Sequence, residues 1–321
     1  MPCDASIPAG ARAVTAVAPA KINLHLGVGD VRGDGYHDLL TVYRAVDLWE
    51  RVTVSLDDDE VVVTGPGAPQ VPTDRTNLAA RAVDLLRDEA GSDARIAIRI
   101  HKGVPVAGGM AGGSADAAAA LVATDRLLGL GLGRAALEER AARLGSDVPF
   151  CIRGGTALGT GRGEKLATLL HARAEQHIVV ALADGGLSTP TVFAELDRLR
   201  AERDPADPER GLPRAGGVDP LVAALAGDDP AAVAGLLAND MEAAALSLMP
   251  ALRRTLCVGR EAGALHGMVS GSGPTCLFFC TDRDHAIAVA AEISEHGVAR
   301  EVRVTRGPVG GAHIVDDPTG K

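Results

Sequence analysis

Apolar positions along the chain follow two spacings, and each spacing predicts one kind of element. Ile96, Ile98 and Ile100 alternate with small or polar residues, which predicts a half-buried strand. Over residues 77–90, apolar side chains recur three or four positions apart, which predicts an amphipathic helix. By the same criteria we expect further strands over residues 14–26, 39–48, 51–56, 61–64, 177–183, 276–280 and 301–305, and further helices over 114–129, 135–144 and 285–296.

Breaker residues divide this pattern. Gly27 and Gly29 are expected to end the first strand, and Ser188-Thr-Pro190 is expected to open a helix that contains Phe193. Strands and helices alternate in both halves, so the prediction is an α+β protein of two domains. We expect a leader over 1–12, a first domain over 13–160, a second over 161–312, a tail over 313–321, and a loop over 204–217.

Composition and charge narrow the classes of function. The 321 residues are 46% hydrophobic and carry a formal net charge of −10 without a cluster of Lys and Arg, which argues against nucleic acid as a partner. The five cysteines lack the paired spacing of a zinc site. We see no signal-peptide pattern and no apolar run long enough for a bilayer, so we expect a cytoplasmic protein without a membrane partner. The oligomeric state has no signal in the sequence.

A glycine-rich segment between a predicted strand and an Ala-rich helix is the strongest candidate for a binding site. Glycines let backbone N–H groups approach an anion, and a helix N-terminus adds partial positive charge. Ser114 is placed to cap the helix or to offer its hydroxyl to a phosphate or a magnesium ion. The spacing fits neither a P-loop nor a dinucleotide-binding fingerprint. A tight turn that only packs the helix on a sheet is the alternative.

Two charged residues stand where catalysis could use them. Lys21 lies in an otherwise apolar predicted strand, and Asp147 lies at a predicted helix start. Phosphoryl transfer needs alignment, charge neutralisation and a group that accepts the hydroxyl proton, and such a pair can contribute to each. The plainer alternatives are a strand-edge lysine that reaches solvent and an aspartate that caps its helix.

The segment from Pro105 to Ala118 resembles the phosphate loop of the GHMP kinases, with Met110 for the usual Leu, Ala111 for the usual Gly and Ala115 for a common Ser. The resemblance implies a first domain like ribosomal protein S5 domain 2 and a ferredoxin-like α/β sandwich as the second. It also implies ATP and Mg²⁺ as cofactors, with Ser114 as the metal ligand. The implied ATP-binding residues are Pro105, Val106, Ala107, Gly108, Gly109, Met110, Ala111, Gly112, Gly113 and Ser114.

The same resemblance assigns chemical roles. Asp147 would be the general base, and Lys21 would hold it ionised and orient the acceptor or the transferred phosphate. A third family motif is present as Gly271-Ser272-Gly273. This glycine turn would support the phosphate loop, and a plain hairpin turn is the alternative.

The block from Gly33 to Leu39 is similar to the branch of this family whose acceptor is a small cytidyl diphosphate. Tyr36 and His37 would then contact the cytosine, Asn23 would bind the substrate, and Phe193 would cover the other face of the base or belong to the core. Two alternatives stay open: a GHMP kinase for homoserine or mevalonate, and a non-catalytic regulatory or nucleic-acid-binding relative.

Overall fold

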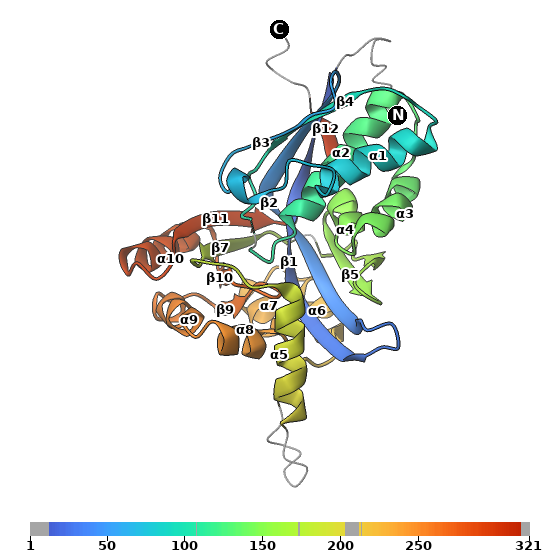
Figure 1. The fold of residues 1–321 in the computed structure, drawn as a ribbon. Coiled ribbons are helices and arrows are strands. Elements are labelled where there is room, and N and C mark those ends of the chain that lie inside the picture. The colour runs from blue at the N-terminus through green and yellow to red at the C-terminus, as the bar shows by residue number, and fades with distance from the viewer. Residues whose placement is uncertain (1–12, 107, 173, 203–211, 213, 316–321) are drawn as a thin grey trace.

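The computed structural model describes residues 13–106, 108–172, 174–202, 212 and 214–315, which form two sheets with helices packed on them (Figure 1). In this part of the chain, the first sheet has eight strands and the second has four. The central path of the first sheet is β12 (His313–Val315), β1 (Ala13–Val31), β2 (His37–Leu56), β4 (Ile96–His101) and β3 (Val61–Thr64), joined by β5 (Thr156–Thr160), β6 (Lys165–Thr168) and β8 (Ala238–Asn239). The prediction of an α+β protein is confirmed.

A long antiparallel hairpin of β1 and β2 forms the centre of the first sheet. Two boundary predictions are wrong here, because β1 continues through Gly27 and Gly29 to Val31, and the segments 39–48 and 51–56 are one strand. Gly27 pairs with Leu40 in the β1–β2 ladder. Pairing along the whole hairpin therefore overrides the weak strand preference of glycine, which a local pattern cannot reveal.

Four helices cover one face of the first sheet: α1 (Leu78–Glu89), α2 (Gly112–Leu128), α3 (Arg134–Leu144) and α4 (Val148–Arg153), with a 3-10 turn over Ala68–Gln70. The predicted helix over 77–90 is confirmed, and the Asn77 side chain caps it by accepting a hydrogen bond from the Ala79 N–H at 2.8 Å. All the alanines of α2 are fully buried, and the helix packs against β1, β2 and α1. Their small side chains allow the helix to lie close to the sheet.

The second sheet is antiparallel in the order β11 (Glu301–Gly307), β7 (Gln176–Leu182), β10 (Cys276–Cys280) and β9 (His266–Val269). One face packs on helices of the second half, and the other packs against β1 and β2, so the two sheets share a core. The helices of this half are α5 (Thr189–Ala201), α6 (Asp219–Ala224), α7 (Pro230–Ala234), α8 (Glu242–Leu248), α9 (Leu252–Glu261) and α10 (Arg283–Glu295).

Strand pairing crosses the expected domain limits. The short strand β6 pairs with β5, so the first sheet continues past residue 160. The strand β12, which we expected to lie in a tail, pairs with β1 in the first sheet. The expected leader over 1–12 lies outside the described residues, as does most of the loop expected over 204–217.

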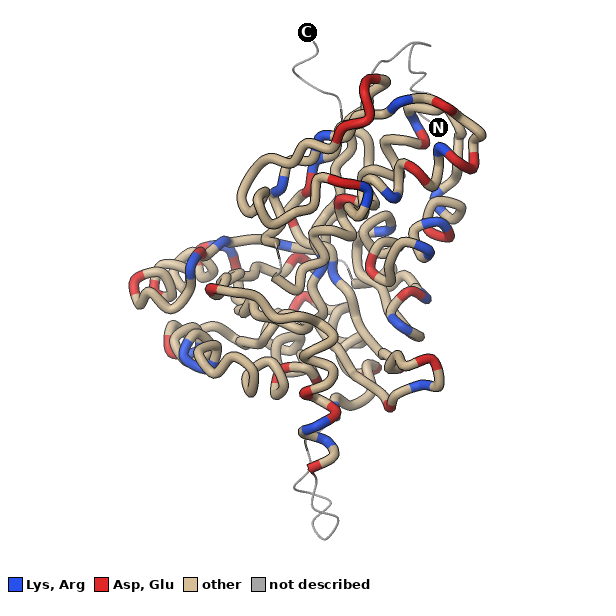
Figure 2. Tube along the Cα trace, in the orientation of Figure 1, with Lys and Arg blue, Asp and Glu red and all other residues tan. Residues whose placement is uncertain are grey.

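Figure 2 shows Lys and Arg interspersed with Asp and Glu over the described chain, without a continuous basic stripe. Among the described residues, no helix is both long and apolar enough to cross a membrane.

Candidate functional site

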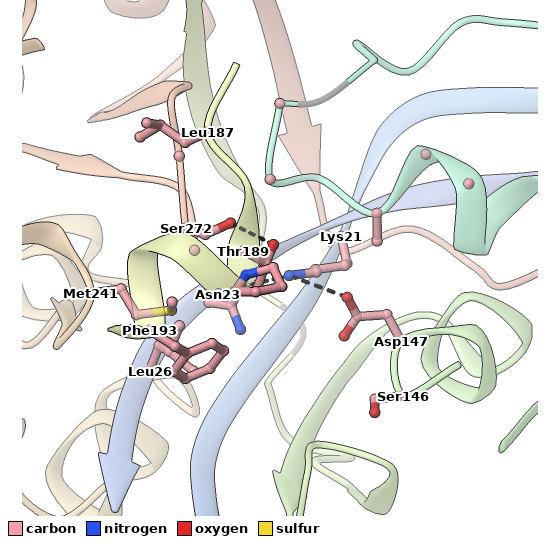
Figure 3. A pocket seen from close by; sticks show the side chains of 18 of the residues that line it. Lys21, Asn23, Leu26, Ser146, Asp147, Leu187, Thr189, Phe193, Met241 and Ser272 are labelled. Carbon is pink, nitrogen blue, oxygen red and sulfur yellow. Dashed lines mark hydrogen bonds and ion pairs between the residues drawn. The ribbon is translucent and has the colours of Figure 1, made fainter. Parts of the chain in front are cut away.

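A cavity of about 870 Å³ lies where the two halves of the molecule meet (Figure 3). Its wall combines β1, the glycine-rich loop, the start of α4, the β9–β10 turn and α5. The predicted site residues found in this wall are Lys21, Asn23, Tyr36, His37, Pro105, Val106, Gly108, Gly109, Ala111, Gly112, Gly113, Asp147, Phe193, Gly271, Ser272 and Gly273. Met110 is instead fully buried in the core, Ser114 is not in the wall, and Ala107 lies outside the described residues.

The glycine-rich loop leads from β4 into α2 with a left-handed turn at its end. Ala111 has φ 58° and occupies the N-cap position, so the helix begins at Gly112 and Ser114 lies in its first turn rather than at the cap. The intrahelical bonds start with the Ala115 N–H, which donates to the Ala111 carbonyl. The N–H groups of the first turn therefore have no intrahelical acceptor, which is the arrangement that binds anions.

The β9–β10 hairpin turn holds this loop from the other side. Gly109 has φ +70°, and a Cβ atom there would lie 2.4 Å from the Ser270 carbonyl oxygen. At Gly108 a Cβ atom would lie 2.8 Å from Thr275 Oγ1. On the opposite side, the Lys21 N–H donates to the Met110 carbonyl at 3.2 Å. The turn is thus both a hairpin turn and a direct contact of the loop, and glycine is required for that close approach.

Lys21 and Asp147 point toward one another across the cavity (Figure 3), with 3.6 Å between Lys21 Nζ and Asp147 Oδ2. The Lys21 side chain is only 9% exposed, so a lysine that reaches solvent is the wrong interpretation. Asp147 occupies the N-cap position of α4 but makes no side-chain capping bond, and its side chain lies in the cavity wall instead. Lys21 Nζ also donates to Asn23 Oδ1 at 2.9 Å, and the Asn23 amide donates to Thr41 Oγ1 at 2.7 Å.

One contact of Asp147 was not predicted from the sequence. The Tyr43 hydroxyl donates to Asp147 Oδ1 at 3.0 Å. Tyr43 lies opposite Asn23 in the β1–β2 register, on the strand next to Lys21. Only the pairing of these two strands could have pointed to this residue.

Beneath the loop lies a buried cluster that sequence reasoning also missed. Lys102 Nζ is 2.6 Å from Glu50 Oε1 and 2.5 Å from Asp116 Oδ2, and the other Glu50 oxygen accepts the Gly103 N–H at 3.0 Å. Burial, followed by the charge of Asp116, raises the pKa of Glu50 to about 7. Burial also raises the pKa of Asp116, while Lys102 opposes the shift. Lys102 and Asp116 both reach the cavity wall.

The far end of the cavity carries aromatic side chains. The His37 ring stacks on Phe193 with 4.8 Å between centroids and 12° between planes, and His37 Nε2 is 2.9 Å from Asp197 Oδ1. The Tyr36 side chain is exposed, and the Arg162 guanidinium lies 5.0 Å from its ring centroid. Flat rings with polar edges can bind a planar base by stacking and hydrogen bonding.

The oxygen atoms available in the cavity wall fit a magnesium ion that arrives with a nucleotide. Within the described residues, no three His, Cys, Asp or Glu side chains gather as a metal site. Mg²⁺ is commonly held by substrate phosphates, waters and one or two protein oxygens. Asp116 Oδ1 is a buried oxygen without a hydrogen-bond partner in the described structure, and its residue reaches the cavity wall. Ser114 as metal ligand stays a prediction.

Comparisons with known proteins place these features in a family. Residues 77–155 match the family described as GHMP kinases N terminal domain, and residues 221–299 match GHMP kinases C terminal. The chain is 57% identical over 300 residues to the 4-diphosphocytidyl-2-C-methyl-D-erythritol kinase of Nocardia farcinica, covering 93% of this chain and 95% of the relative. It is 54% identical over 314 residues to the kinase of the same name from Mycobacterium tuberculosis, covering 98% and 96%.

Solved structures give the same fold. A crystal structure of 4-(cytidine 5'-diphospho)-2C-methyl-D-erythritol kinase matches with a TM-score of 0.72 and 30% identity, over 92% of this chain and 100% of that one. Homoserine kinase from Cytophaga hutchinsonii matches with a TM-score of 0.75 over 97% of this chain and 100% of that one. Its identity of 18% supports a common fold alone.

Proposed function

Since the chain belongs to the GHMP kinase family, and within it to the 4-diphosphocytidyl-2-C-methyl-D-erythritol kinases, we propose that it phosphorylates this cytidyl diphosphate with ATP. The phosphoryl group is transferred to the 2-hydroxyl of the methylerythritol unit, and the products are the 2-phosphate and ADP. The reaction belongs to the non-mevalonate route to isoprenoid precursors. The cytoplasm is its expected location.

The observation that carries this proposal is a single cavity with three chemically different parts. Backbone N–H groups at the start of α2 suit a triphosphate, the Lys21–Asp147 pair suits a reacting hydroxyl, and the His37–Phe193 stack suits a planar base. The pair lies in the wall together with both other parts. A nucleotide-linked alcohol can therefore place its base at one end and its hydroxyl beside the γ-phosphate.

In the proposed step, the acceptor oxygen forms a bond to the γ-phosphorus while the bond from that phosphorus to the β–γ bridging oxygen breaks. The bridging oxygen keeps its electron pair and leaves with ADP, and Asp147 accepts the hydroxyl proton. Lys21 forms an ion pair with this carboxylate and offers positive charge to the transferred group. Partial neutralisation of the β- and γ-phosphates is the chemistry that bound Mg²⁺ supplies. A positioned base contributes roughly 10²- to 10⁴-fold in rate.

An ADP-release assay with Mg²⁺ and ATP tests the proposal with a panel of acceptors. The panel contains the diphosphocytidyl methylerythritol, methylerythritol without the nucleotide, homoserine and mevalonate. We expect turnover with the cytidyl compound alone, because the other acceptors leave the aromatic end of the cavity empty. Turnover with homoserine or mevalonate would keep the kinase and reject the base-binding role of Tyr36 and His37.

Two substitutions separate the chemistry from substrate binding. Asp147→Asn is expected to lower kcat by roughly 10²- to 10⁴-fold while ATP binding persists, because the amide is a poor proton acceptor. Tyr36→Ala is expected to raise the KM of the acceptor and leave the KM of ATP unchanged, and Tyr36→Phe serves as the control that keeps the ring. Near-normal turnover of Asp147→Asn would exclude Asp147 as the base.

A further inference from the structure

Tyr43 contacts both members of the charged pair at once. Its hydroxyl donates to Asp147 Oδ1 at 3.0 Å, and the ammonium of Lys21 lies 5.6 Å from the centroid of its ring. A cation at this distance from an aromatic face is attracted by the ring. One side chain from β2 therefore links a residue of β1 with a residue at the start of α4.

The residues packed around Tyr43 hold its ring in one position. The residue is 2% exposed, and its ring packs against Phe150 with 4.9 Å between centroids. A Cβ atom at Gly163 would lie 2.2 Å from the Tyr43 hydroxyl oxygen, and one at Gly159 would lie 2.7 Å from ring carbon Cε2. The two glycines thus provide the space that the ring occupies, and the hydroxyl is directed at the carboxylate.

The hydroxyl keeps its proton in this position. Burial, followed by the neighbouring charge of Asp147, raises the pKa of Tyr43 well above its ordinary value of 10. Tyr43 is therefore a hydrogen-bond donor near neutral pH and not a proton acceptor. A donor that does not change state gives the carboxylate a constant partner.

We propose that Tyr43 is a positioning residue for the phosphoryl transfer, because its hydroxyl orients the Asp147 carboxylate. The ion pair to Lys21 involves Oδ2 at 3.6 Å, a distance that by itself allows the carboxylate to rotate about its Cβ–Cγ bond. The bond from Tyr43 to Oδ1 fixes this rotation and keeps Oδ2 on the side of Lys21. The inference rests on the proposed function, since it assumes that Asp147 accepts the proton.

A double-mutant cycle in the ADP-release assay tests this role with the full-length protein. Tyr43→Phe keeps the ring and removes the hydrogen bond to a charged group, so we expect kcat to fall about ten-fold while both KM values change less than about two-fold. In the Asp147→Asn background, the same change is expected to alter kcat less than about two-fold. Thr15→Val is the matched control, because it removes another hydroxyl that bonds between β1 and β2, at 2.8 Å from Thr53, outside the cavity.

The outcomes distinguish a failure of the Tyr43 role from a failure of the proposed kinase function. A ten-fold loss that disappears in the Asp147→Asn background supports positioning, and it is a pattern that general loosening of the sheet would not produce. An unchanged kcat of Tyr43→Phe, an equal loss in both backgrounds, or the same loss in Thr15→Val overturns the role of Tyr43 and leaves the kinase in place. A folded wild-type protein that turns over no acceptor overturns the proposed function, and the role of Tyr43 with it.

Discussion

Replacement of Glu50 by Gln tests the electrostatics of the buried cluster beneath the glycine-rich loop. Lys102 lies between two carboxylates, those of Glu50 and Asp116, and all three side chains are at most 3% exposed. With every group ionised, the cluster has a net charge of −1 in a buried place. The Gln side chain keeps the shape and removes one of the two negative charges.

The size and sign of the effect follow from the raised pKa of Glu50. Burial and the charge of Asp116 move this pKa from its ordinary 4.5 to about 7 in the folded protein. The folded state therefore holds a proton that the unfolded state has lost between these two values, so the stabilisation is complete below about pH 4.5 and disappears as the pH rises through about 7. The interval corresponds to about 3 kcal/mol in the free energy of unfolding.

Urea unfolding at pH 5 and pH 8 measures this difference. Trp49 is the only tryptophan of the chain and precedes Glu50 in β2, so its fluorescence reports unfolding of this part of the sheet. The ring of His313 lies edge-on to it at 5.5 Å and can affect its intensity, so the transition midpoint is the quantity to compare. Between pH 5 and pH 8, we expect the free energy of unfolding of Glu50→Gln to rise by about 2 to 3 kcal/mol relative to that of wild type.

The control is Glu60→Gln, the same chemical change at a side chain that is 53% exposed and paired with Arg99. The difference in the free energy of unfolding between this variant and wild type is expected to change by less than about 1 kcal/mol from pH 5 to pH 8. Exposed ion pairs contribute little to stability. If Glu50→Gln differs from wild type by the same amount at both pH values, within about 1 kcal/mol, the argument from burial and like charge is refuted.

Three further predictions concern the loop, the aromatic end and a helix far from the chemistry. Gly109→Ala places a Cβ atom against the Ser270 carbonyl at a positive φ, so steady-state kinetics are expected to show at least a ten-fold rise in the KM of ATP, and an unchanged KM would contradict the close contact. Phe193→Ala removes the ring that stacks on His37, and the KM of the acceptor is expected to rise about two- to ten-fold without a change in the KM of ATP. Asn77→Ala removes the cap of α1 and is expected to lower the free energy of unfolding by about 1 kcal/mol with normal kinetics, which thermal unfolding and the ADP-release assay check together.

Much of the local structure could be predicted from the sequence. The strand over 276–280 has the predicted bounds, and the Ala-rich helix begins and ends within two residues of the prediction. Such elements follow from side-chain spacing and breaker residues within a short window, which the sequence displays directly. The glycine loop, Lys21 and Asp147 could be named for the same reason, since each lies in a short motif.

Contacts between distant segments could not be predicted in this way. Tyr43 and Asp147 are 104 positions apart, and neither local sequence indicates that the other is near. The strand pairing of β1 with β2, and the place of α4 beside them, bring the hydroxyl to the carboxylate. The expected cap at Ser114 shows the same limit, because the left-handed turn at Ala111 starts the helix earlier and places Ser114 in its first turn.

The sequence by itself determined the order of the main elements, the glycine-rich loop and the residue types available for phosphoryl transfer, because these depend on short-range spacing and backbone preference. The tertiary structure alone decided that β12 returns to the first sheet, that a Lys102–Glu50–Asp116 cluster lies under the loop, and that Tyr43 joins the charged pair. Those features depend on strand register and on packing between segments far apart in the chain. They arise only when the two sheets pack together around a shared core, because that packing sets the distances between these segments.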